Sequence, residues 1–301
     1  MRLSHRELRV RAAEARGHYA RCDLCAHQCR VDRTRGPAGV CREDDGLWLA
    51  GAGVHFGEEP PLVGSRGSGL VLIGGCNLAC ESCETFELSL ERQGLVRTSA
   101  PQLAALLLDL EKKGAANANF VTPTHVLPVL LEGLALAAEH GFTLPVVWNC
   151  GGYESLEALR LLDGVVDVYL PDAKYGDDAV ALALSGCKGY TGALRESLVE
   201  MHRQAGPLVS SGGLATSGVI VRHLVLPGGA AAPEKLMSLL AAVSTELTLN
   251  VLSQYRPVHR AARFPVISRG VLPEEVQAAV GLAQRAGLRR VLVDGREVPS
   301  A

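Results

Sequence analysis

The sequence predicts an α/β protein in which a β/α barrel, or part of one, follows a cysteine-rich N-terminal segment. From residue 69 onward, short apolar runs alternate with longer helical stretches, as in a series of strand–helix repeats. Most of these runs lack polar/apolar alternation, which is typical of parallel strands buried on both faces. No GxGxxG motif follows the first run, so a barrel is favoured over a dinucleotide-binding fold. We expect residues 1–64 to form an irregular module, and residues 65–301 to form a partial (β/α)6 barrel of TIM type with a C-terminal helix and strand.

The individual elements follow from apolar runs and helix-end signals. Ser99 precedes a helical stretch with Pro101 near its start, and Gly114 and Gly141 follow two helical stretches where a left-handed residue is favoured. Strands are expected at 70–73, 118–122, 145–148, 165–170, 218–226, 247–252 and 290–293. Helices are expected at 100–113, 126–140, 154–162, 194–204, 233–243 and 273–285.

Composition excludes several classes of protein. With 48% apolar residues, the chain can bury enough surface to offset the entropy of ordering, so most of it is not disordered. The 30 Lys and Arg residues are balanced by 32 Asp and Glu residues, so the overall basic charge of a nucleic-acid-binding protein is missing. No apolar run approaches the roughly 20 residues that span a bilayer, and no signal peptide is visible. We expect a soluble, cytoplasmic protein with no membrane or nucleic-acid partner.

The cysteines fall into two groups. In a reducing compartment, clustered thiols indicate metal or redox chemistry before disulfides. The single residues Cys150 and Cys187 are expected to be buried, inert thiols. The first 42 residues carry ten Arg against four carboxylates, which indicates a solvated face, charge compensation for thiolates or a docking patch for an acidic redox partner. The groups are Cys22, Cys25, Cys29 and Cys41, and Cys76, Cys80 and Cys83.

The second group is a CxxxCxxC motif directly after the first buried strand. Cys76, Cys80 and Cys83 can bind three irons of a [4Fe–4S] cluster and leave the fourth iron open to a substrate or cofactor. A zinc site needs a fourth protein ligand nearby, and none follows closely in the sequence. The end of a barrel strand is also where barrel enzymes place their active sites.

This loop, GGCNLACESC, resembles the cluster loop of radical S-adenosylmethionine (SAM) enzymes. The longer pattern is similar to the pyruvate formate-lyase activating enzyme-like family, over about residues 22–260. The matching segments are Cys22-Asp-Leu-Cys25 with Cys29 and Gly39-Val-Cys41, Gly57-Glu-Glu-Pro-Pro-Leu, Gly67-Ser-Gly69, Val121-Thr-Pro-Thr-His125, Tyr169-Leu-Pro-Asp-Ala-Lys174, Arg222-His-Leu-Val-Leu-Pro-Gly228 and Gln254-Tyr-Arg-Pro257.

The resemblance implies an enzyme whose reduced [4Fe–4S] cluster cleaves SAM. The 5′-deoxyadenosyl radical so produced abstracts hydrogen from a substrate, while the protein positions the cofactor and excludes water. It also implies an electron donor such as flavodoxin or ferredoxin, and a glycyl radical enzyme or other protein as substrate. Modification of a peptide or small molecule is an equal alternative, because family likeness does not transfer the substrate. A non-catalytic iron–sulfur or electron-transfer protein and a zinc-dependent binding module are further alternatives, although neither needs a barrel.

The same resemblance points to five cofactor-binding residues at strand ends. They are Thr122, Asn149, Asp172, Lys174 and His223. Read from the residues alone, Asp172 and Lys174 lie on one side of a strand and could instead form a structural ion pair. His223 alone would be a satisfied core histidine.

The loop departs from the family at the residue before its third cysteine. Radical SAM loops usually carry an aromatic residue there, next to the adenine, whereas this chain has Ser82. Phe86 or another wall would then contact the adenine. Tyr255 and Arg256, just past the last barrel strand, are candidates for the substrate mouth.

The N-terminal cysteines have the spacing CxxC-x3-C-x11-C and can complete a metal site without help. A zinc ion with four cysteine ligands and an auxiliary iron–sulfur cluster are both chemically adequate. Four protein ligands leave no open metal position, which favours a structural role; a second cluster would serve as an electron relay.

Overall fold

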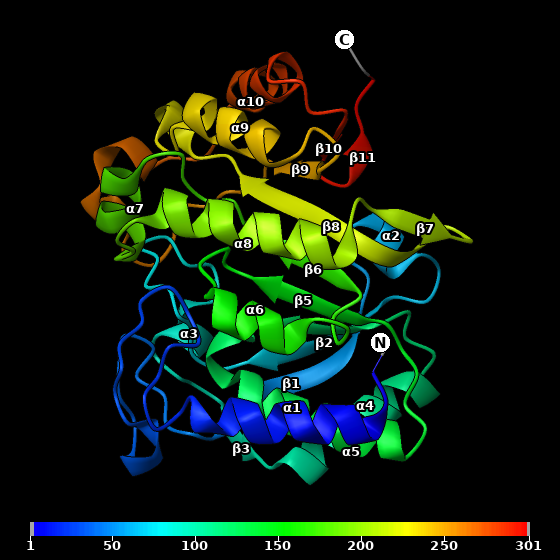
Figure 1. Ribbon diagram of the computed structural model, residues 1–301. Helices are drawn as coiled ribbons and strands as arrows, with labels where there is room; N and C mark the ends of the chain where they lie inside the picture. Colours follow the sequence, from blue (N-terminus) through cyan, green and yellow to red (C-terminus); the bar gives the residue numbers. More distant parts are fainter. Residues whose placement is uncertain (1–2, 300–301) are drawn as a thin grey trace.

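The computed structural model describes residues 3–299 and shows a mixed α/β fold around one large sheet (Figure 1). The strands pair in the order β11-β10-β9-β8-β6-β5-β4-β2-β1-β3, and β7 pairs with β8. Their bounds are β1 Leu47–His55, β2 Ser68–Ile73, β3 Val96–Thr98, β4 Ala118–Val121, β5 Val146–Cys150, β6 Val168–Pro171, β7 Val209–Ser211, β8 Leu214–Leu224, β9 Thr248–Leu252, β10 Arg290–Val293 and β11 Arg296–Glu297.

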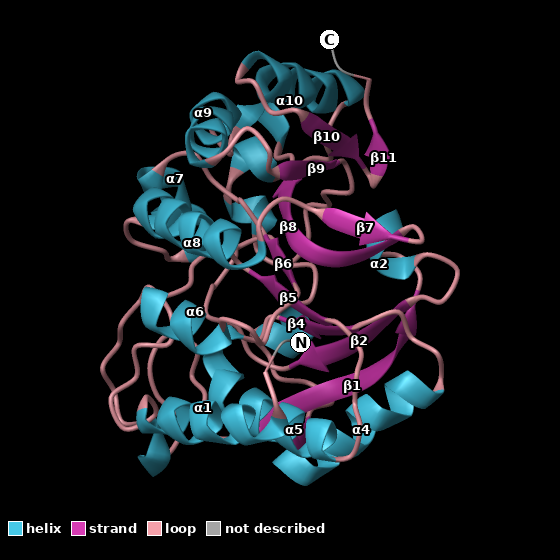
Figure 2. Ribbon diagram, turned by 45° about the vertical axis from the view of Figure 1, so that its right-hand side comes forward, coloured by secondary structure: helices cyan, strands magenta, loops and turns pink. Residues whose placement is uncertain are grey.

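The central strands β2, β4, β5, β6, β8, β9 and β10 are parallel and pair in the order in which the chain makes them. At least one helix lies between each pair of consecutive parallel strands, which is the usual crossover for such pairs. In Figure 2, α6, α8 and α9 lie on one side of the strands. The principal helices are α4 Ala100–Lys112, α5 Leu127–Glu139, α6 Leu156–Leu162, α8 Tyr190–Ala205, α9 Pro233–Val243 and α10 Pro273–Arg285.

All six strands that carry the predicted repeats are present, and the α/β class is confirmed. The pairing path is open: within residues 3–299, its end strands β3 and β11 do not pair with each other. Closure toward a partial barrel therefore stays a prediction. No helix within the described residues is long and apolar enough to cross a membrane.

The two faces of the sheet differ in what they bury. Phe120, Trp148 and Tyr169 belong to the large core that packs against the helices. On the opposite face, Val147 and Ile220 belong to a smaller cluster that also includes Leu62, Val168, Leu170 and Ala215. Leu62 comes from the short helix α2 (Pro60–Val63), which covers this inner face. Since alternate residues of each strand are buried on both faces, the strands read as continuous apolar runs.

A buried ion-pair cluster joins α2 to the inner face of β8. Arg222 donates through Nε to Glu59 Oε1 at 2.8 Å and through Nη2 to Glu58 and Glu59 at 2.5 and 2.6 Å. Asn250 of β9 donates to Glu59 Oε1 at 2.8 Å. The side chains of Glu59 and Arg222 are 1% and 15% exposed, so both charges of this ion pair are largely shielded from water.

The N-terminal segment is more regular than the sequence analysis expects. Helix α1 (His5–Gly17) begins with a capping box in which Ser4 accepts from the Glu7 amide and Glu7 accepts from the Ser4 amide. It packs on α5, and β1 pairs antiparallel with β2. The expectation of an irregular segment is wrong for these two stretches, because the Arg-rich composition of α1 and the glycines of β1 conceal their apolar positions.

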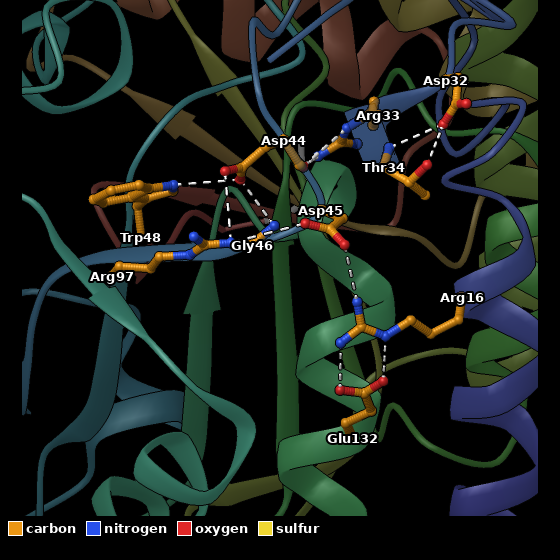
Figure 3. A network of polar contacts seen from close by, with 10 residues as sticks. All are labelled: Arg16, Asp32, Arg33, Thr34, Asp44, Asp45, Gly46, Trp48, Arg97 and Glu132. Atoms are coloured by element: carbon orange, nitrogen blue, oxygen red, sulfur yellow. Dashed lines mark hydrogen bonds and ion pairs between the residues drawn. The ribbon is translucent and has the colours of Figure 1, made fainter. Parts of the chain in front are cut away.

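Ion pairs fasten this segment to the helices around the sheet. Arg16 of α1 lies between Glu132 of α5 and Asp45, which precedes β1 (Figure 3). Its Nε lies 2.5 Å from Glu132 Oε1, and its Nη1 lies 3.5 Å from Asp45 Oδ2. The boundary near residue 64 stays a prediction, but the segment before it contributes a strand to the main sheet.

Helix α7 (Asp178–Ser185) is a further element that the sequence analysis does not predict. The Asp177 side chain accepts from the amides of Ala179 and Val180, and Gly186 ends the helix with a left-handed backbone at φ 68°. The C-terminal end of α7 lies against the Cys76–Cys83 loop, since the Ala79 amide donates to the Ser185 carbonyl at 3.2 Å.

Candidate functional site

The loop from Cys76 to Cys83 follows β2 at the carboxyl end of the parallel sheet, where the sequence analysis expects it. Each of the three sulfurs has a hydrogen-bonding group next to it, as is common for thiolates that bind iron. These groups are the Leu78 amide 3.3 Å from Cys76 Sγ, the Ser185 hydroxyl 3.0 Å from Cys80 Sγ and the Ser89 hydroxyl 3.2 Å from Cys83 Sγ.

Burial controls the thiols of this loop. It raises the pKa of Cys76 above its usual value, and the neighbouring Cys80 raises it further. Burial also raises the pKa of Cys80, while Lys174 and the Ser185 hydroxyl act in the opposite direction. The Cys76 and Cys80 thiols therefore stay protonated until a metal displaces their protons, which is how thiolate ligands normally bind.

The three thiols of this loop are not grouped as the ligands of a single metal ion. Within residues 3–299, no three His, Cys, Asp or Glu side chains converge in the way that one metal ion requires. A cluster does not require this convergence, because each thiolate binds a different iron. Three thiols on one loop with hydrogen-bonding groups at their sulfurs are therefore compatible with the predicted [4Fe–4S] cluster.

Asp172 and Lys174 leave β6 beside the cysteine loop. Lys174 Nζ lies 2.7 Å from Asp172 Oδ2, and their side chains are 25% and 31% exposed. Burial alone would lower the pKa of Lys174, but Asp172 and Cys80 outweigh it and hold that pKa well above its usual value. The pair exists, as one of the two interpretations of the sequence expects, and its ammonium group lies close to the Cys80 thiol.

Thr122 and Asn149 lie together at the ends of β4 and β5. The Thr122 amide donates to the Asn149 carbonyl at 2.8 Å. Thr122 has a left-handed backbone at φ 58°, which is unfavourable for a β-branched residue. Strain of this kind costs on the order of 1–3 kcal/mol and concentrates at functional sites.

Replacing Thr122 with Asn tests this strain. Asn tolerates a left-handed backbone, so we expect the free energy of unfolding to rise by about 1 kcal/mol in urea titrations. The affinity for SAM is expected to fall, because Thr122 is one of the residues predicted to contact this cofactor. Thr98→Asn, within strand β3, is the control and should slightly destabilise the protein. A loss of stability in Thr122→Asn equal to that of the control would contradict the strain.

His223 lies beside the same strand end but is almost fully enclosed. Its Nδ1 donates to the Ala173 carbonyl at 2.8 Å, between Asp172 and Lys174. Its Nε2 has no hydrogen-bond partner among the described residues, and the ring lines a pocket with Glu275 of α10. Burial lowers the pKa of His223, so the ring is neutral near neutral pH. Its role as a cofactor contact stays a prediction.

Residue 82 is a serine, so an aromatic contact with the adenine would have to come from another residue, such as Phe86. Phe86 stacks on His259 with ring centroids 4.8 Å apart. Tyr255 is 4% exposed and donates its hydroxyl to the Ile267 carbonyl at 2.7 Å, so it supports the loop after β9 more than it opens a mouth. Arg256 is exposed and acts on Glu84, whose pKa burial raises and Arg256 lowers.

The sequence analysis misses Ser185 altogether, and it does not place Cys187 at this site. Ser185 bridges Cys80 and Tyr175, whose hydroxyl lies 2.6 Å from the Ser185 hydroxyl. Cys187 is buried as expected, but it lies close enough to Cys80 and Lys174 for both to shift its pKa, which burial raises to about 12. The only sequence signal for either is the Gly186 that ends α7. Cys150 is also buried, and its carbonyl accepts from the Asp172 amide at 2.8 Å.

The N-terminal cysteines lie around one place. Cys22, Cys25, Cys29 and Cys41 all line one small cavity, together with Arg33 and His125. This cavity adjoins the start of the Cys76–Cys83 loop, because His125 Nε2 lies 2.9 Å from the Gly74 carbonyl oxygen.

Comparisons with known proteins show a similar sequence and weakly similar solved structures. No family model matches the chain. An uncharacterized protein of Methanocaldococcus jannaschii, MJ0674, is 29% identical over 282 residues, which are 91% of this chain and 77% of that protein. Crystal structures of Streptococcus suis SuiB, one of them bound to SAM, match 73% of this chain with a TM-score of 0.46 and 10% identity. The matched part spans less than half of the SuiB chain.

Proposed function

We propose that this protein is a radical SAM enzyme. The observation that carries the proposal is the Cys76–Cys83 loop, with a hydrogen-bonding group beside each sulfur and the Lys174 ammonium group close to Cys80. Three thiolates are enough to hold a [4Fe–4S] cluster and leave one iron for SAM. When bound, these cofactors supply reductive cleavage to a 5′-deoxyadenosyl radical, which abstracts hydrogen from the substrate.

The residues of this chain would bind, orient and shield the cofactors. The three cysteines hold the cluster, and Ser185 positions Cys80 through its hydroxyl. Asp172 orients Lys174, whose positive charge suits an anionic partner such as a carboxylate or a thiolate-bound cluster. Thr122 and Asn149 complete the same edge of the sheet.

The resemblance to the pyruvate formate-lyase activating enzyme-like family supports two finer proposals. The sheet would close into a partial barrel around the cofactor, and the product would be a glycyl radical on a partner enzyme. Modification of a peptide or small molecule, such as epimerisation or rearrangement, is an equal alternative. The reductant would be flavodoxin or ferredoxin. Detection of a glycyl radical on a co-encoded protein would separate the first product from the second.

The test is anaerobic reconstitution with iron and sulfide, followed by dithionite and SAM. We expect 5′-deoxyadenosine from the natural chain and none from Cys76→Ala. Ser210→Ala is the control, because Ser210 is exposed on β7, and it should retain production. A reducible cluster that leaves SAM intact, with and without candidate substrates, would overturn the proposal and favour an electron-transfer protein.

A further inference from the structure

The cavity lined by the four N-terminal cysteines has the form of a metal-binding loop. The Cys22 amide donates to the Val31 carbonyl at 2.9 Å and the Arg30 amide to the Cys22 carbonyl at 2.7 Å, so the loop returns on itself. Cys22, Cys25, Cys29 and Cys41 all line the cavity that this loop encloses.

The backbone beside these cysteines is strained. Gln28, Arg30 and Arg42 have left-handed backbones at φ 43°, 54° and 56°, and each lies next to a cysteine of the group. Gly39 also has a positive φ, and a Cβ there would lie 3.3 Å from Cys29 Sγ. Non-glycine residues adopt this backbone rarely and keep it where the surroundings demand it. These positions lie in the loop whose four cysteines line the cavity.

Arg33 supplies an unusual charge to this cavity. The residue is 1% exposed, and its guanidinium donates to the backbone carbonyls of Glu43 and His125. It also donates to the carbonyl of Asp44 (Figure 3). Within the described residues, no ion pair joins it to a carboxylate. Its Nη1 lies 3.7 Å from Cys22 Sγ. A buried cation needs a counter-ion, and the groups in reach that can become anionic are the cysteine thiols.

We propose that Cys22, Cys25, Cys29 and Cys41 hold a second metal centre with four thiolate ligands, and that Arg33 is its counter-ion. A tetrathiolate zinc ion or a cubane iron–sulfur cluster would carry a net negative charge that balances the positive charge of Arg33. Within the described residues, no three of these side chains are grouped closely enough to hold a single ion as they stand, so zinc binding requires the sulfurs to turn further inward. This centre is complete without an outside ligand, unlike the three-cysteine loop. Its role is therefore structural or electron-conducting, and it does not bind a substrate.

The proposed centre also stabilises the Cys76–Cys83 loop. This extension rests on the proposed function of that loop. His27, between two of the cysteines, donates through Nε2 to the Asn77 carbonyl at 2.9 Å. His125, whose carbonyl accepts from Arg33, donates through Nε2 to the Gly74 carbonyl at 2.9 Å. Loss of the centre would thus loosen Gly74–Asn77, the segment that carries Cys76.

The first experiment measures metal in a chain in which Cys76, Cys80 and Cys83 are all replaced with Ala. We expect about one zinc per chain, or iron with matching labile sulfide. Metal equal to that of a variant lacking all seven cysteines, with both proteins folded by circular dichroism, would overturn the proposal. Because the Cys76–Cys83 loop has no thiols in this variant, failure of the radical SAM proposal would leave this result unaffected.

Arg33 variants in the same background test the counter-ion and retain all four ligands. We expect Arg33→Met to lose metal to a chelator at least about tenfold faster, and Arg33→Lys to restore much of the retention. Arg35→Met is the control, because the Arg35 side chain is 86% exposed. Equal rates of metal loss in Arg33→Met and Arg35→Met would contradict the assignment.

Hydrogen exchange, measured in the variant that lacks the cysteines at positions 76, 80 and 83, tests the link between the proposed centre and the 76–83 loop. We expect His27→Ala to raise the exchange of residues 74–83 with its metal content unchanged, and His27→Gln to restore part of the protection by donating to Asn77. The control is His140→Ala, because His140 is exposed and contacts its own helix through Leu136. Equal exchange in His27→Ala and His140→Ala would disprove the link.

Discussion

Replacing Arg222 with Met is expected to lower the free energy of unfolding by about 3–5 kcal/mol. The guanidinium is the partner of Glu59, which is almost fully buried, and it also pairs with Glu58. Burial alone would raise the pKa of Glu59, but Arg222 and Asn250 keep it below its usual value. Without Arg222, the Glu59 carboxylate would be left buried with only Asn250 to stabilise it. Urea titrations of the two proteins give the difference.

The control for this prediction removes the Arg222 and Glu59 charges together. Arg222→Met combined with Glu59→Met should recover part of the loss, because replacing a buried ion pair with apolar groups is often nearly neutral, while Glu58 still loses its partner. The natural pair also has a pH signature. Since the pKa of Glu59 is lowered on folding, its contribution is present above pH 4.5 and fades as the pH falls below that value. A loss below about 1 kcal/mol in Arg222→Met would show that the pair is solvated instead.

Replacing Lys174 with Met is expected to make the cluster on the Cys76 loop harder to reduce. The ammonium group lies beside Cys80, so its removal takes away a positive charge that favours the added electron. We expect a midpoint potential about 60 mV more negative, which corresponds to a tenfold smaller reduced fraction. Spectroscopic redox titration of the reconstituted protein measures this shift independently of SAM cleavage.

Charge variants of opposite sign and distant position serve as controls for Lys174→Met. Asp172→Asn should shift the potential in the positive direction, because it removes the anion that pairs with Lys174. Lys112→Met, on exposed α4, should leave the potential unchanged. The same shift in Lys112→Met as in Lys174→Met would mean that the effect is not local.

Much of the sheet is predictable because its strands are apolar on both faces. The run at 118–122, for example, is β4, and the expected helices 233–243 and 273–285 are α9 and α10. Helix α1 is hard to predict because Arg residues cover its exposed face, although its Ser4-x-x-Glu7 capping box is visible in the sequence. Strand β1 is equally hard to predict because glycines interrupt its apolar pattern.

The candidate site is predictable where its residues are local. Cys76, Cys80 and Cys83 are set by their spacing, and Asp172 and Lys174 by their place after a strand. Ser185 contacts Cys80 across more than 100 residues of chain, so no local pattern could reveal it. The left-handed backbone of Thr122 is equally invisible, because it depends on how β4 and β5 end side by side.

The short strands at the two ends of the sheet have a consequence for the behaviour of the protein at high concentration. β3 has three residues and β11 has two, and both carry exposed charged side chains, among them Arg97 and Glu297. An edge this short and charged offers few free backbone groups to a strand of another molecule. The long apolar strands between them are therefore protected from edge-to-edge aggregation.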